Sequence, residues 1–70
     1  MLEALSIDNL ILRVKGEYRE MPGLSLTFSQ AQRLWNMEPS RCATVLDALV
    51  RLQFLHKTAL GYYARREALA

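Results

Sequence analysis

Apolar residues between Pro39 and Leu52 recur at positions i, i+3, i+4 and i+7, the spacing of a helix with one buried face. Pro39 suits the first helical turn, where its missing N–H leaves no hydrogen bond unmade. The pattern therefore predicts a helix over 39–52. Its inward face is expected to hold Cys42, Val45, Leu46, Leu49 and either Leu52 or Gln53. Its outward face is expected to hold Arg41, Thr44, Asp47, Ala48 and Arg51.

The first third of the chain contains another helical pattern, followed by a reversal. Leu10, Val14 and Tyr18 lie four residues apart, which predicts a helix over 7–20 with Ser6 or Asp8 as its N-cap. The Pro-Gly pair at 22–23 then favours a turn. Alternating apolar and polar residues over 24–27 predict a short strand.

A short helix and a hairpin complete the expected elements. We predict a helix over 28–36, capped by Thr27 or Ser29, with Ala31, Leu34 and Trp35 facing inward. Residues 54–66 read as a hairpin, with strands over 54–58 and 62–66 joined by a Gly-containing turn at 59–61.

A length of 70 residues allows one domain, over 1–70, with a small core. A core of this size leaves a homodimer open, with contacts through the helix at 7–20 and through Met1, Leu2 and Leu5. The single cysteine, Cys42, cannot form an internal disulfide, and the first residues lack a basic leader and a long apolar run. No segment has the run of about 20 apolar residues that spans a membrane. We therefore expect a cytoplasmic protein.

The net charge of +2 is unevenly distributed along the chain. Residues 1–29 contain three Lys or Arg against four Asp or Glu, whereas residues 30–70 contain six against three. The basic side of the molecule is therefore expected to lie on the last two helices and the hairpin. This distribution suggests an acidic partner such as nucleic acid.

Three stretches of the chain are similar to the bacterial winged helix-turn-helix domain. They are Leu26–Trp35, Cys42–Val50, and the hairpin segments Phe54–Thr58 and Gly61–Tyr63, with V-L-D-x-L-V-x-x-x-F-L-x-x-T-x-x-G-x-Y beginning at Val45. The resemblance covers residues 24–66 and implies an α+β fold that is mainly α, with three helices and a two- to three-stranded wing sheet. It also implies sequence-specific binding of double-stranded DNA by a small transcriptional regulator. The chain departs from the family at Gln53, where Gly is common, and its wing is short.

In proteins of this family the third helix lies in the major groove and its first residues touch base edges. The resemblance places Ser40, Arg41 and Thr44 at those positions, and Arg41 has the geometry to pair with guanine O6 and N7. The wing, including His56, is expected to contact phosphates. Further phosphate candidates lie on the two preceding helices. The full set of DNA-binding candidates is Ser40, Arg41, Thr44, Arg51, Lys57, Arg65, Arg66, Gln30 and Arg33.

Each of these residues also has a purely structural interpretation. Ser40 can cap its helix and Arg41 can solvate it. Asp47 can accept a hydrogen bond from cytosine, but an ion pair with Arg51 at i+4 is the preferred interpretation. The basic residues of the wing can act as a solvated hairpin edge.

No residue pattern indicates an enzyme. His56 is the sole histidine and has no Cys, Asp or Glu at the spacing of metal ligands. The chain has no P-loop, Gly-rich phosphate cradle or nucleophile–base pair, so we expect no catalysis, no cofactor and no small-molecule ligand. Trp35 and Cys42 are expected in the core. The alternative function is a winged-helix module that binds a partner protein without DNA, which the low net charge, Asp47 and the short wing favour.

Overall fold

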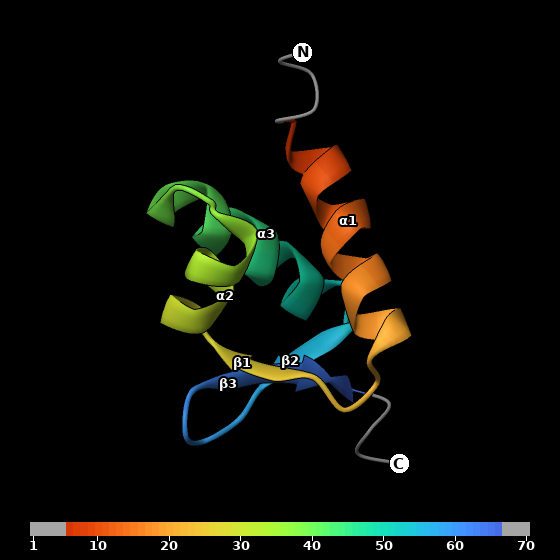
Figure 1. The fold of residues 1–70 in the computed structure, drawn as a ribbon. Helices are drawn as coiled ribbons and strands as arrows, with labels where there is room; N and C mark the ends of the chain where they lie inside the picture. Colours follow the sequence, from red (N-terminus) through yellow and green to blue (C-terminus); the bar gives the residue numbers. More distant parts are fainter. Residues whose placement is uncertain (1–5, 67–70) are drawn as a thin grey trace.

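A computed structural model describes residues 6–66, which form three helices and one antiparallel sheet (Figure 1). The elements are α1 (Ile7–Glu20), β1 (Ser25–Thr27), α2 (Phe28–Trp35), α3 (Pro39–Arg51), β2 (Leu55–Lys57) and β3 (Tyr62–Arg65). The sheet order is β1-β3-β2, so the strand before α2 extends the C-terminal hairpin. The expected α+β fold class is confirmed, with three helices and a three-stranded antiparallel sheet in the described residues.

Helix α1 begins and ends where its sequence predicts. The side-chain oxygen of Ser6 accepts a hydrogen bond from the Asn9 N–H, so Ser6, and not Asp8, is the N-cap. The helix continues through Gly16 to Glu20. After it, the Leu24 N–H donates to the Met21 carbonyl at 2.9 Å, which closes the turn at Pro22 and Gly23. The chain is thereby returned toward the sheet (Figure 1).

Helix α2 is short but closed at both ends. Thr27 is its N-cap and forms a capping box with Gln30, in which each side chain accepts from the other's backbone N–H. At the other end Asn36 adopts a left-handed conformation, with φ of 50°. The Asn36 N–H then donates to the Arg33 carbonyl and the Met37 N–H to the Gln32 carbonyl. The predicted end at 36 lies one residue beyond the observed one.

Helix α3 ends in the same kind of turn, but its left-handed residue is Gln53, with φ of 63°. The Gln53 N–H donates to the Val50 carbonyl and the Phe54 N–H to the Leu49 carbonyl, which is the Schellman pattern. The departure from Gly at this position therefore leaves the turn intact. It places a residue with a β-carbon in a conformation that costs roughly 1–2 kcal/mol.

We expect Gln53→Gly to stabilise the fold by about 1 kcal/mol, because glycine adopts the left-handed conformation without strain. The greater conformational freedom of glycine in the unfolded chain cancels only part of this gain. The free energy of unfolding, measured by urea denaturation, checks the prediction. Gln53→Ala is the matched control, since alanine keeps the β-carbon. It is expected to leave stability nearly unchanged, and an equal gain for both variants would contradict the explanation.

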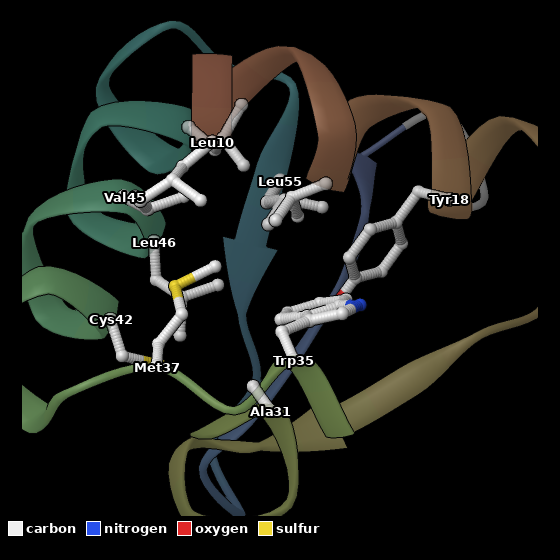
Figure 2. Close-up of a cluster of buried hydrophobic side chains, with 11 residues drawn as sticks. Leu10, Tyr18, Ala31, Trp35, Met37, Cys42, Val45, Leu46 and Leu55 are labelled. Atoms are coloured by element: carbon white, nitrogen blue, oxygen red, sulfur yellow. The ribbon is translucent and has the colours of Figure 1, made fainter. Parts of the chain in front are cut away.

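The core lies between the three helices and the sheet (Figure 2). Trp35 and Cys42 are buried, as predicted. Two predictions of the inward faces are wrong: Leu34 on α2 is 54% exposed, and Leu52 and Gln53 lie on the surface after α3 ends. The buried residues are Leu10, Val14, Tyr18, Ala31, Trp35, Met37, Cys42, Val45, Leu46, Leu49 and Leu55.

The sheet is joined to the helices by Tyr18 of α1. Its hydroxyl donates to the carbonyl of Tyr63 in β3 at 2.8 Å. Tyr63 packs against the core from the centre of the sheet, paired with Leu26 on one side and Lys57 on the other. The two hairpin strands, β2 and β3, are shorter than the predicted strands over 54–58 and 62–66. Gly61, with φ of 90°, permits the turn between them.

Candidate nucleic-acid interface

Helix α3 presents one side to solvent, and that side is the centre of the candidate interface. Its buried side is almost fully covered, with Val45 and Leu49 both at 0% exposure. At about 100° per residue, the exposed stripe opposite them contains Ser40, Thr44, Asp47 and Arg51. The stripe carries two hydroxyls, one carboxylate and one guanidinium, and all four residues are exposed.

An open groove of about 510 Å³ runs between this side of α3 and the sheet. Its polar groups come from α3 and from Lys57 of β2, whose ammonium lies 5.7 Å from the centre of the Tyr63 ring. The groove brings the wing's lysine to the same hollow as Thr44 and Asp47. The lining residues are Phe28, Ala43, Thr44, Asp47, Val50, Lys57 and Tyr63.

The two hydroxyls at the start of α3 are held by local hydrogen bonds. Ser40 Oγ donates to the Glu38 carboxylate at 3.1 Å, and Thr44 Oγ1 donates to the Ser40 carbonyl at 3.0 Å. The N-cap is Glu38, which makes no side-chain cap bond. The interpretation of Ser40 as the cap is therefore wrong.

Arg41 and Thr44 were expected on one face but line different hollows. Arg41 is half-buried and lies in a second hollow of about 500 Å³, beside Arg13 of α1 and Glu38. On the helix, Arg41 is only about 90° from the centre of the buried face, so it lies on the flank toward α1. The rest of this hollow is lined by Leu10, Leu34, Trp35, Asn36 and Met37.

Asp47 and Arg51 form the predicted ion pair, with the Arg51 Nε atom 3.2 Å from Asp47 Oδ2. Both side chains are mostly exposed, so the pair adds little stability, about 0.3–0.5 kcal/mol. Its main effect is local: it partly neutralises Arg51 and places a carboxylate in the middle of the exposed stripe.

The other candidates are distributed over the remaining surface. Gln30 uses its side chain in the capping box of α2, whereas Arg33 is exposed on the same helix. The Arg66 side chain is exposed just after β3, and its N–H donates to the Phe54 carbonyl. Arg65 lies apart from the groove, with its guanidinium 4.7 Å from the centre of the Phe54 ring.

Two basic residues that were not among the candidates join Arg65. Lys15 and Arg19 of α1 also lie over the Phe54 ring, at 5.4 and 5.9 Å from its centre. They were missed because they belong to the part of the sequence with net negative charge. Their i, i+4 spacing was the available signal, since it places both on one flank of α1.

Within residues 6–66, no group of three His, Cys, Asp or Glu side chains is arranged to hold a metal ion. No helix in that range has the length and apolarity needed to cross a membrane. Burial raises the pKa of the Cys42 thiol, which reduces its thiolate fraction and its reactivity.

No protein-family model, curated protein or solved structure matches the chain.

Proposed function

We propose that the chain is a small cytoplasmic transcriptional regulator that binds double-stranded DNA, with α3 in the major groove and the wing on phosphates. The observation that supports this most is the placement of α3: its apolar side is covered, and its polar side borders a groove that also contains Lys57. A helix held in this way presents a polar side narrow enough for a major groove about 12 Å wide.

Each side chain has a separate role in this proposal. Ser40 and Thr44 accept hydrogen bonds from base amino groups, or donate to bases and phosphates after releasing their local acceptors Glu38 and the Ser40 carbonyl. Lys57 contacts a phosphate from the wing. Arg41 reads a guanine from the flank of the helix, next to the second hollow. Arg33, Arg51 and Arg66 are exposed and contribute to the attraction of the DNA backbone.

The test is binding of duplex DNA of mixed sequence by the whole chain over a range of salt concentrations. Each phosphate neutralised contributes about −0.9 to the slope of log affinity against log salt. Lys57→Gln is expected to weaken binding to all sequences and to reduce the slope by about 0.9. Arg41→Ala is expected to reduce the preference for a selected site by about 1–3 kcal/mol. Absence of salt-sensitive binding would overturn the proposal.

Asp47→Asn is expected to strengthen DNA binding, because it removes a negative charge from the side of α3 that would face the phosphates. Its effect on stability should stay within about 0.5 kcal/mol, since the ion pair with Arg51 is exposed. Glu20→Gln at the exposed end of α1 is the control for the change in net charge. An equal gain in affinity for both variants would mean that Asp47 does not face the DNA.

A partner-protein module is the second candidate, favoured by the apolar tip of the wing. Leu60, in the turn between β2 and β3, is 83% exposed where a phosphate-binding wing would carry a cation. If the wing lies on DNA, Leu60→Lys should increase affinity for duplexes. If the chain is a protein-binding module, neither the wild-type chain nor Leu60→Lys should bind duplexes in a salt-sensitive way.

A homodimer through α1 is the alternative to a chain that binds DNA as a monomer. Leu12 is exposed on this helix, whereas Met1, Leu2 and Leu5 lie outside the described residues. A two-fold dimer would place half-sites about 34–36 Å apart on the DNA. Sedimentation of the chain at several concentrations tests for it.

A further inference from the structure

Three cationic side chains surround the single ring of Phe54. Lys15 and Arg19 reach it from α1, and Arg65 reaches it from β3, all within 6 Å of the ring centre. Phe54 itself is fixed in place by the turn that ends α3 and by an edge-on contact with the Tyr18 ring. We call Lys15, Arg19 and Arg65 the Phe54 cluster.

The fold assembles this cluster from distant parts of the sequence. Lys15 and Arg19 are one turn apart on α1 and lie on the same flank. Arg65 is paired with Leu55 across the sheet, at the opposite end of the β2–β3 pairing from Lys57 and Tyr63. At about 100° per residue, Glu17 is about 160° from both Lys15 and Arg19, whereas Glu20 is about 140° from Lys15 and about 100° from Arg19.

The Phe54 cluster is separate from the groove beside α3. Neither that groove nor the hollow at Arg41 contains Phe54 or any of the three cations. Leu55, which is fully buried, lies between Phe54 and the β2 end that carries Lys57. The cluster therefore forms a second basic surface, on the α1 side of the molecule.

Cations beside a partly buried surface ring gain only about 0.5–1 kcal/mol each, and basic side chains held close together raise the positive potential around Phe54. A polyanion is attracted to this potential and releases its own counterions on binding. The cations lie around the ring and Tyr18 meets it at 89°, so the site offers charges and little free ring face for stacking a base. These features fit phosphate groups recognised without regard to sequence.

We propose that the Phe54 cluster binds the phosphate backbone of a second DNA segment, so that one chain holds two duplexes together. This inference rests on the proposed function, because the first duplex occupies the α3 side. It also rests on a chain that binds as a monomer, because Leu12 lies only about 20° from Arg19 around α1 and a dimer through that flank would cover the cluster. The shape of the site favours an extended backbone, since the cations come from two elements and the side chains are partly exposed.

The test measures capture of a labelled duplex in solution by an immobilised duplex in the presence of the whole chain. The wild-type chain is expected to retain the labelled duplex. Near physiological salt the Lys15→Gln/Arg19→Gln/Arg65→Gln variant is expected to lose this capture while still binding a single duplex. At lower salt, where the variant still retains measurable DNA, three lost phosphate contacts should reduce the salt slope of capture by about 2.7 relative to the wild-type chain.

A second variant and a control keep the result interpretable. Substitution of Arg65 can disturb the sheet, whereas Lys15→Gln/Arg19→Gln changes only the surface of α1. This double variant should reduce the salt slope of capture by about 1.8. Arg13→Gln, on the other flank of α1, should retain capture. Sedimentation of each variant excludes a changed oligomeric state as the cause.

The outcomes separate the two proposals. A wild-type chain that binds no duplex overturns both. A wild-type chain that binds a duplex but captures no second one overturns the bridging alone, as does full capture by the folded double and triple variants. Loss of stability without loss of capture would assign the cluster to packing over Phe54.

Discussion

Leu49→Ala is expected to lower the free energy of unfolding by about 2–5 kcal/mol, the usual cost of deleting a fully buried leucine side chain. Leu49 is 0% exposed on α3, and its carbonyl also accepts the Phe54 N–H that ends the helix. A chain of 70 residues has a total stability of about 3–10 kcal/mol, so this single change removes a large share of it.

Leu52→Ala is the matched control for this prediction. It makes the same chemical change three residues further along, but Leu52 is 63% exposed, so the expected cost is within about 0.5 kcal/mol. Urea denaturation followed by circular dichroism measures both variants. Similar losses for Leu49→Ala and Leu52→Ala would mean that α3 does not bury the face described above.

Tyr18→Phe is expected to cost about 1–3 kcal/mol at neutral pH, because the Tyr63 carbonyl loses the hydroxyl that donates to it at 2.8 Å. The effect should depend on pH. Burial first, and then the neighbouring Cys42 and Tyr63, raise the pKa of Tyr18 from 10.0 to about 12. The folded state therefore favours the neutral phenol over the phenolate.

The sign of the pH effect follows from this shift. The contribution of the neutral Tyr18 phenol is complete below pH 10.0 and is lost as the pH rises toward about 12. The phenylalanine variant has no such group, so the stability difference between the two chains should shrink over that interval. Denaturation curves of both chains from neutral pH to pH 12 measure the change, and a constant difference would contradict it.

Local rules predicted most of the elements because the relevant residues act on their neighbours in sequence. Thr27 and Gln30 form a capping box, and Pro39 starts α3, through interactions that stay within one turn. The buried stripe of α3 was predictable because four apolar residues in the right spacing define one direction. Only the end of that stripe was ambiguous: α3 ends at Arg51, and both Leu52 and Gln53 in the turn that follows are exposed.

Features that depend on distant contacts were harder to predict. Helix α2 has only eight residues, so its apolar pattern is too short to define one buried direction. In the structure Ala31 and Trp35 face the core, and Leu34 is exposed. Arg41 lies on a flank, and which hollow it joins depends on where α1 packs. The Phe54 cluster needs α1, the α3 turn and β3 at once, and a count of charges along the sequence divides it between two segments of opposite net charge.

The position of Trp35 has a practical consequence for all of these measurements. It is the sole tryptophan, it is 4% exposed, and its ring centre lies 6.2 Å from that of Tyr18. Its fluorescence therefore reports on the core without any label. Emission should move to longer wavelengths when the chain unfolds, and tyrosine emission quenched by energy transfer to the indole should reappear. Trp35 also lines the hollow beside Arg41, so DNA held on the α3 surface should alter its emission, but by much less than unfolding does because the indole stays buried.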